Sequence, residues 1–175
     1  MKKVSLFFAI FLTALSLGLT SCSTEDPAIP LSVNTSADKM ATISGTLLIN
    51  SDLTKEFTSQ KYEGMRSVNI IVTVSYKDIF QNAQAKGSWS TTVTTDTKGM
   101  FSVSVPSNET GVNVEFNASD VRGERKRKVG VDSKTFSGVW KFSIPSVNVK
   151  AKQTVIIPYV EGSFNDLKED GSNVY

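Results

Sequence analysis

The chain has 175 residues, with 19 Lys and Arg, 17 Asp and Glu, one Cys and no His. The absence of His removes the commonest general base and transition-metal ligand, and a single Cys excludes an internal disulfide or a cysteine-rich metal site. Lys2 and Lys3 fall in a segment that we expect to be removed, which leaves 17 basic and 17 acidic side chains. Bulk charge therefore does not draw the protein to polyanions, so any such binding needs a local basic patch.

The first 21 residues predict an export signal. Lys2 and Lys3 precede an apolar stretch over 6–19, diluted only by Thr, Ser and Gly. A comfortable membrane span needs about 20 apolar residues. This stretch is shorter and has the flanks of a secretory signal peptide, so we expect residues 1–21 to be removed.

The signal ends in Leu19-Thr20-Ser21-Cys22, which resembles the lipobox of bacterial lipoproteins. In that family the cysteine thiolate receives a diacylglycerol, the signal is cut before the cysteine, and the new amino terminus is acylated. The resemblance implies that Cys22 is the lipid attachment site, carrying palmitate-type chains. The alternative is an ordinary secretory signal that happens to contain a cysteine.

Residues 22–38 are expected to form a flexible tether behind the lipidated cysteine, because they are rich in Ser, Thr, Asp, Pro and Asn and lack periodicity. Ser23 resembles an outer-membrane sorting residue, and Glu25-Asp26 resembles the surface-export signal of Bacteroidetes lipoproteins. These resemblances imply an outer-membrane lipoprotein, lipid-anchored and exposed at the cell surface.

Residues 39–161 have a period of two, as in the alternation of Val68, Ile70, Val72 and Val74 with mostly polar residues. The expected strands are 41–49, 67–76, 88–95, 100–105, 112–118, 127–131, 135–144 and 153–160, with 147–151 as a further candidate. Short strands separated by turns predict an all-β fold, a single antiparallel sandwich of seven or eight strands. The remaining segment, 162–175, is expected to be a loosely ordered tail.

The run from Thr91 to Pro106 places the turn Asp96-Thr97-Lys98-Gly99 between a Thr-rich strand and a Phe-containing strand, which predicts a hairpin. It resembles the hairpin of carboxypeptidase-regulatory-like domains and other transthyretin-like (prealbumin-like) sandwiches. Segments 41–47 and 68–74 resemble that family's first two strands. The resemblance implies a transthyretin-like β-sandwich that serves as an accessory, adhesive or assembly module without catalytic activity.

A basic run carries five cations within seven residues: Arg122, Arg125, Lys126, Arg127 and Lys128. As a functional site, it would contact an anionic partner such as lipopolysaccharide head groups or an acidic glycan. The competing interpretation is a solvated hairpin loop between strands 112–118 and 127–131, whose charge discourages edge pairing. Nucleic acid is not expected as a partner, because the expected location is extracytoplasmic and no aromatic residues interleave the cations.

Aromatic residues offer a second candidate surface. Tyr62 and Phe80 fall in the two long connections and are expected to be exposed binding residues. Trp89 and Trp140 share strand faces with apolar neighbours and are expected to pack in the core.

No serine, threonine or carboxylate stands in a recognisable catalytic motif, so we expect no enzyme, no cofactor and no metal. The sequence favours a non-enzymatic outer-membrane lipoprotein whose β-sandwich is a binding or accessory module for a protein or glycan partner. The alternative is a fimbria-associated structural or anchoring subunit that assembles by strand exchange.

Overall fold

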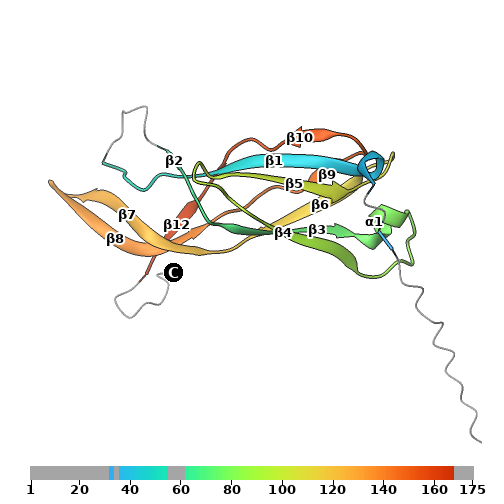
Figure 1. Cartoon of the computed structure of the whole chain (residues 1–175). Helices are drawn as coiled ribbons and strands as arrows, with labels where there is room; N and C mark the ends of the chain where they lie inside the picture. The colour runs from blue at the N-terminus through green and yellow to red at the C-terminus, as the bar shows by residue number, and fades with distance from the viewer. Residues whose placement is uncertain (1–31, 34–35, 55–61, 168–175) are drawn as a thin grey trace, which may run out of the picture. The chain divides into compact units, whose positions relative to one another are not determined.

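Strands make up nearly all the regular structure of the described residues, which are 32–33, 36–54 and 62–167 of the computed structural model (Figure 1). The elements, in chain order, are η1 (Ala37–Lys39), β1 (Met40–Ile49), β2 (Glu63–Gly64), β3 (Asn69–Ser75), α1 (Tyr76–Phe80), β4 (Ser88–Thr94), β5 (Met100–Pro106), β6 (Val112–Ala118), β7 (Val121–Val129), β8 (Asp132–Lys141), β9 (Val147–Val149), β10 (Thr154–Ile156), β11 (Val160–Glu161) and β12 (Ser163–Asp166).

Two of the sheets form a sandwich, so the all-β prediction is confirmed. In the first, β1 lies between β5 and β2 on one edge and β10 and β11 on the other. The second has the order β4-β3-β6-β9 and is antiparallel throughout. The first sheet is mixed, because β10 and β11 run parallel to β1. The described residues form twelve strands where seven or eight were expected. Pro158 separates β10 from β11, the tail adds β12, β2 was not predicted, and β9 is the further candidate at 147–151.

The core lies between these two sheets and follows the alternation seen in the sequence. Ile43 and Leu47 of the first sheet and Ile70 and Val72 of the second are fully buried. The complete set of buried cluster residues is Ala41, Ile43, Leu47, Val68, Ile70, Val72, Val74, Phe101, Val103, Val105, Val112, Val114, Ile144, Val149 and Ile157. Trp89 packs against this cluster, as predicted.

The Asp96–Gly99 turn forms as predicted but does not close a hairpin. Asp96 Oδ1 accepts hydrogen bonds from the backbone N–H groups of Lys98 and Met100, both at 2.8 Å, and Gly99 has φ 75°. The strands on either side belong to different sheets, β4 to the second and β5 to the first. Buried Thr95 holds this crossing in place, because its Oγ1 donates to Met65 O at 2.6 Å and accepts from Val68 N. The turn therefore connects the two layers of the sandwich.

A third sheet, of order β12-β8-β7, carries a hairpin that extends past the ends of β1 and β5 (Figure 1). We call residues 121–141, which form β7, its turn and β8, the hairpin arm. Its register is continuous from Val121↔Trp140 to Val129↔Asp132. The expectation of a loop over the basic run is thus wrong, and the strands expected at 127–131 and 135–144 are instead β7 and β8.

The expectation of a loosely ordered tail is also wrong for its first part. Ser163–Asp166 forms β12 and pairs antiparallel with β8, from Ser163↔Lys141 to Asp166↔Gly138. Phe164 supplies the reason, because its ring packs on Trp140 at a centroid distance of 4.7 Å. Residues 168–175 lie outside the described residues.

Candidate binding surface

The five predicted cations all lie on β7, and the strand's alternation divides them between two faces of the hairpin arm. Side chains two residues apart share a face of a strand. Arg125 and Arg127 lie on one face and are half-buried, while Arg122, Lys126 and Lys128 lie on the other and are exposed. The cluster seen in the sequence is therefore two separate sets in space. We call the half-buried side the inner face and the exposed side the outer face.

On the inner face, Arg127 is held by a ring and by a carboxylate. Its guanidinium carbon lies 3.8 Å from the centre of the Phe136 ring, and its Nη2 lies 2.8 Å from Oδ2 of Asp166 on β12. A guanidinium stacked on an aromatic face while paired with a carboxylate keeps its charge in a fixed position. Arg127 thus joins all three strands of the third sheet.

Arg125 covers a pair of aromatic rings on the same face. Its guanidinium carbon lies 5.6 Å from the Trp140 ring and 5.8 Å from the Phe164 ring, and Trp140 is only 1% exposed. Gly138 leaves room for this pair, because a Cβ there would come within 2.3 Å of the Phe164 ring. Trp140 is therefore buried as predicted, and two of the five cations stabilise the arm itself.

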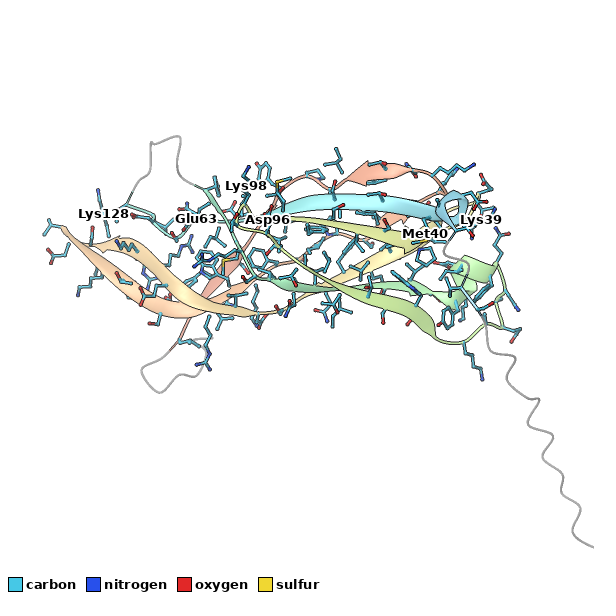
Figure 2. All side chains as sticks on the ribbon, viewed as in Figure 1. Lys39, Met40, Glu63, Asp96, Lys98 and Lys128 are labelled. Atoms are coloured by element: carbon cyan, nitrogen blue, oxygen red, sulfur yellow. The ribbon has the colours of Figure 1, made fainter. Side chains whose placement is uncertain are left out.

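The outer face carries the cations that are available to a partner. Among the described residues, Arg122, Lys126 and Lys128 make no ion pair, and Glu124 is the acidic residue of β7 on this face. Figure 2 shows Lys128 near the free end of the arm. Hydroxyl side chains of β8 lie beside these residues in the register, namely Ser133, Thr135 and Ser137. This face offers cations and hydroxyls, a combination that suits phosphate, carboxylate and sugar groups.

Charge is strongly segregated between the hairpin arm and the rest of the chain. The arm holds seven Lys and Arg and two acidic residues, a net charge of +5. The other residues from 22 onward hold ten Lys and Arg and fifteen Asp and Glu, a net charge of −5. The near neutrality of the whole therefore hides a strongly basic arm.

The tip of the arm is apolar, a feature that the sequence interpretation did not single out. Val131 is 98% exposed and Val129 is 43% exposed. Gly130 between them has φ 65°, and among the described residues no atom other than those of its chain neighbours lies within 4 Å of an added Cβ, so none of them packs on the turn at this point. Two valines around a glycine beside a charged run are a signal that could have been read from the sequence.

The two aromatic residues expected to be exposed do not form a joint surface. Tyr62 is 39% exposed, and its hydroxyl donates to Oε2 of Glu161 at 3.1 Å. Phe80 is half-buried, because α1 folds its ring against Tyr76 at a centroid distance of 5.6 Å. Their elements lie at opposite ends of the sandwich (Figure 1). The expectation for Phe80 was therefore wrong.

The lipobox residues Leu19, Thr20, Ser21 and Cys22 lie outside the described residues. Within 32–33, 36–54 and 62–167, no helix has the length and apolar character needed to cross a membrane. The same residues contain no group of three or more acidic or cysteine side chains placed to hold a metal ion.

Comparisons with known proteins leave this surface to be interpreted from its own residues. No family model and no curated protein matches the chain. Three distantly similar solved structures, each with a TM-score of 0.36, are the major plantain pollen allergen Pla l 1 (13% identity, covering 70% of this chain and 92% of that one), a Pseudomonas aeruginosa protein provisionally described as carbohydrate binding (12%, 70% and 90%) and a double mutant of the shaft pilin SpaA from Lactobacillus rhamnosus GG (12%, 71% and 50%).

Proposed function

We propose that the protein is a non-enzymatic outer-membrane lipoprotein of the Bacteroidetes type, anchored through lipid on Cys22 and exposed at the cell surface. The sequence Leu19-Thr20-Ser21-Cys22 supports the anchor, and the run from Thr91 to Pro106 supports a sandwich of transthyretin-like type. The sandwich acts as a binding module, and its partner is an acidic protein or an acidic glycan.

The segregation of charge carries this proposal. The hairpin arm has a net charge of +5, while the other residues from 22 onward have −5. Arg125 and Arg127 stiffen the arm through their aromatic contacts, whereas Arg122, Lys126 and Lys128 face outward without an ion pair among the described residues. A stiff basic projection attracts an anionic partner and loses little conformational freedom on binding.

The test of anchoring and exposure is protease treatment of intact cells that express the full chain or its Cys22→Ser variant, with palmitate labelling in parallel. We expect the wild-type protein to incorporate palmitate and to be cleaved on intact cells while a periplasmic marker stays whole. The variant should lose the label. Protection of the wild-type protein until the outer membrane is opened would overturn surface exposure, and labelling of the variant would overturn the anchor.

A second candidate function is a fimbria-associated subunit, favoured by the pairing of β1. Its edge is completed by β10 and β11 over only three and two residue pairs, and Ile156 in β10 and Tyr159 next to β11 are exposed. Such short terminal strands are candidates for replacement by a strand of a neighbouring subunit. This function predicts ladders of multimers after extraction in mild detergent, and an Ile156→Lys variant should shorten them. Purely monomeric protein would argue against it.

A further inference from the structure

An acidic partner explains the cations of the hairpin arm but not its tip. A two-residue turn with glycine at its first central position requires the freedom of Gly130, yet it accepts polar residues at the second position. Val131 is 98% exposed, so the fold gains no packing from it, and the neighbouring Val129 is also exposed. An apolar end on a basic projection matches a target with an apolar layer behind an anionic one.

We propose that the partner of the hairpin arm is a phosphorylated glycolipid at a bilayer surface. Lys126 and Lys128 of the outer face contact its phosphates, and Ser133 and Thr135 beside them contact its sugar hydroxyls. The tip valines enter the boundary of the acyl layer. This inference rests on the proposed function, and it narrows the acidic partner from any protein or glycan to a glycan carried on lipid.

The distribution of charge along the arm agrees with this assignment. Arg127 lies near the tip but is committed to Phe136 and Asp166. Lys134 adds an exposed cation on β8, opposite Arg127 in the register, and Asp132 is the one acidic residue at the turn. The cations available near the tip therefore outnumber the acidic residue there. Each such cation strengthens attraction to an anionic membrane surface about fivefold.

Tethering makes a contact of this strength effective. Figure 2 shows Lys39 and Met40, where the tether joins the domain, at the end opposite Lys128, so the domain has to lie along the surface for the arm to reach it. In that position, a lipid on Cys22 keeps the arm at a high local concentration over the same surface. The arm then needs little intrinsic affinity to hold the domain in one orientation on that surface. A basic patch combined with an acyl chain is a usual pair of signals for stable attachment to a membrane.

The test uses chain 22–175 with Cys22→Ser, so that the anchor contributes nothing, and measures cosedimentation with three kinds of vesicle. These are phosphatidylcholine alone, phosphatidylcholine with phosphatidylglycerol, and phosphatidylcholine with lipopolysaccharide. We expect binding that is strongest with lipopolysaccharide and absent with phosphatidylcholine alone. Soluble deacylated lipopolysaccharide glycan should compete only weakly, because it has no acyl layer for the valines.

Two variants, each with a matched control, separate the roles of charge and tip. Lys126→Gln with Lys128→Gln should weaken binding to lipopolysaccharide vesicles by about 10- to 30-fold. The control pair, Lys150→Gln with Lys152→Gln, has the same spacing and exposure away from the arm and should change nothing. Val131→Asn, which the turn accepts, should weaken binding about three- to tenfold, whereas Ile156→Asn should not.

Four outcomes would overturn the inference. Binding to phosphatidylglycerol vesicles as strong as binding to lipopolysaccharide vesicles would show that the arm does not recognise the sugar. Full competition by the deacylated glycan would show that the valines do not contact the acyl layer. An unaffected Val131→Asn variant would show the same. Absence of binding to every vesicle would leave an acidic protein as the partner. None of these results affects palmitate labelling or protease accessibility of the full chain, so the anchoring proposal is tested separately.

Discussion

The sandwich and the hairpin arm are built from the same kind of strand but are stabilised in different ways. In the sandwich, aliphatic side chains from two sheets bury one another, and Leu47 and Val72 have no exposed surface. In the arm, arginines cover aromatic rings on one face only, and the other face is open. A face covered by guanidinium groups can project into solvent because the same side chains bury rings and remain charged. This difference shows that some side chains of a basic run can stabilise the fold by covering aromatic rings.

The largest expected effect belongs to the aliphatic core. Leu47→Ala should lower the free energy of unfolding by about 3 kcal/mol, because it leaves a cavity between the sheets. Urea denaturation measures this change. Ile71→Ala is the control, since Ile71 is 48% exposed on the outer side of β3, and it should cost less than about 1 kcal/mol. Equal losses in the two variants would mean that the core is not where the two sheets meet.

Gly138→Ala should produce the largest effect within the third sheet. Its new methyl group would lie 2.3 Å from the Phe164 ring and 2.4 Å from Asn165 O, so β12 must move away from β8. We expect a cost of about 1–3 kcal/mol, with faster hydrogen exchange confined to 121–141 and 163–166. Ser137→Ala, on the opposite face, is the control. Equal loss of protection in β1 and β3 would contradict a separate stabilisation of the arm.

Arg127→Lys tests the guanidinium layer itself. Charge is kept, but stacking on Phe136 and the planar pairing with Asp166 are lost. The expected loss is about 1 kcal/mol, because the group is partly exposed, and it should appear as faster hydrogen exchange along the arm. Arg122→Lys on the outer face should leave exchange unchanged. If both substitutions acted alike, position on the inner face would have no special role.

The smallest effect is expected on the outer face. The double variant Lys126→Gln with Lys128→Gln should change the free energy of unfolding by less than about 0.5 kcal/mol, because neither side chain has an ion pair among the described residues. Thermal unfolding of the variant and the wild-type protein measures the difference. A loss above about 1 kcal/mol would show that these lysines stabilise the arm, and any binding defect would then have a structural cause.

Sequence periodicity predicted the sandwich well and the region after residue 120 poorly. Alternating apolar residues identify β1, β3, β5 and β6 because burial on one face dictates the pattern, whereas the two-residue β2 was not predicted. In β7 the alternating residues are Arg, Glu and Lys, whose strand propensity is low, so their pattern indicates a loop before residue 127. The true turn is at Gly130. Pairing with β8 and the aromatic contacts of Arg125 and Arg127 outweigh local propensity there, and neither can be seen in a local window.

The candidate site was predicted in its composition but not in its arrangement. The five cations were identified, yet their division between two faces depends on β7 being a strand. Phe164, which completes the aromatic layer, lies in a segment whose polar and acidic neighbours suggested a loose tail. A strand was predicted over 153–160, but its division into β10 and β11 and the existence of β12 depend on tertiary contacts, because two to four residues carry too little pattern to specify a strand.

The pairing of β1 with segments from near the end of the described chain sets the order in which the protein can fold. Thr42 pairs with both Ser104 and Thr154, so the first strand stays open on one edge until the last ones have been synthesised. Contacts so distant in sequence slow folding, because the chain must lose the entropy of a long loop before they form. The domain should therefore reach its native state only after synthesis is complete, and a fragment that stops after β8 should leave β1 free to pair with other chains.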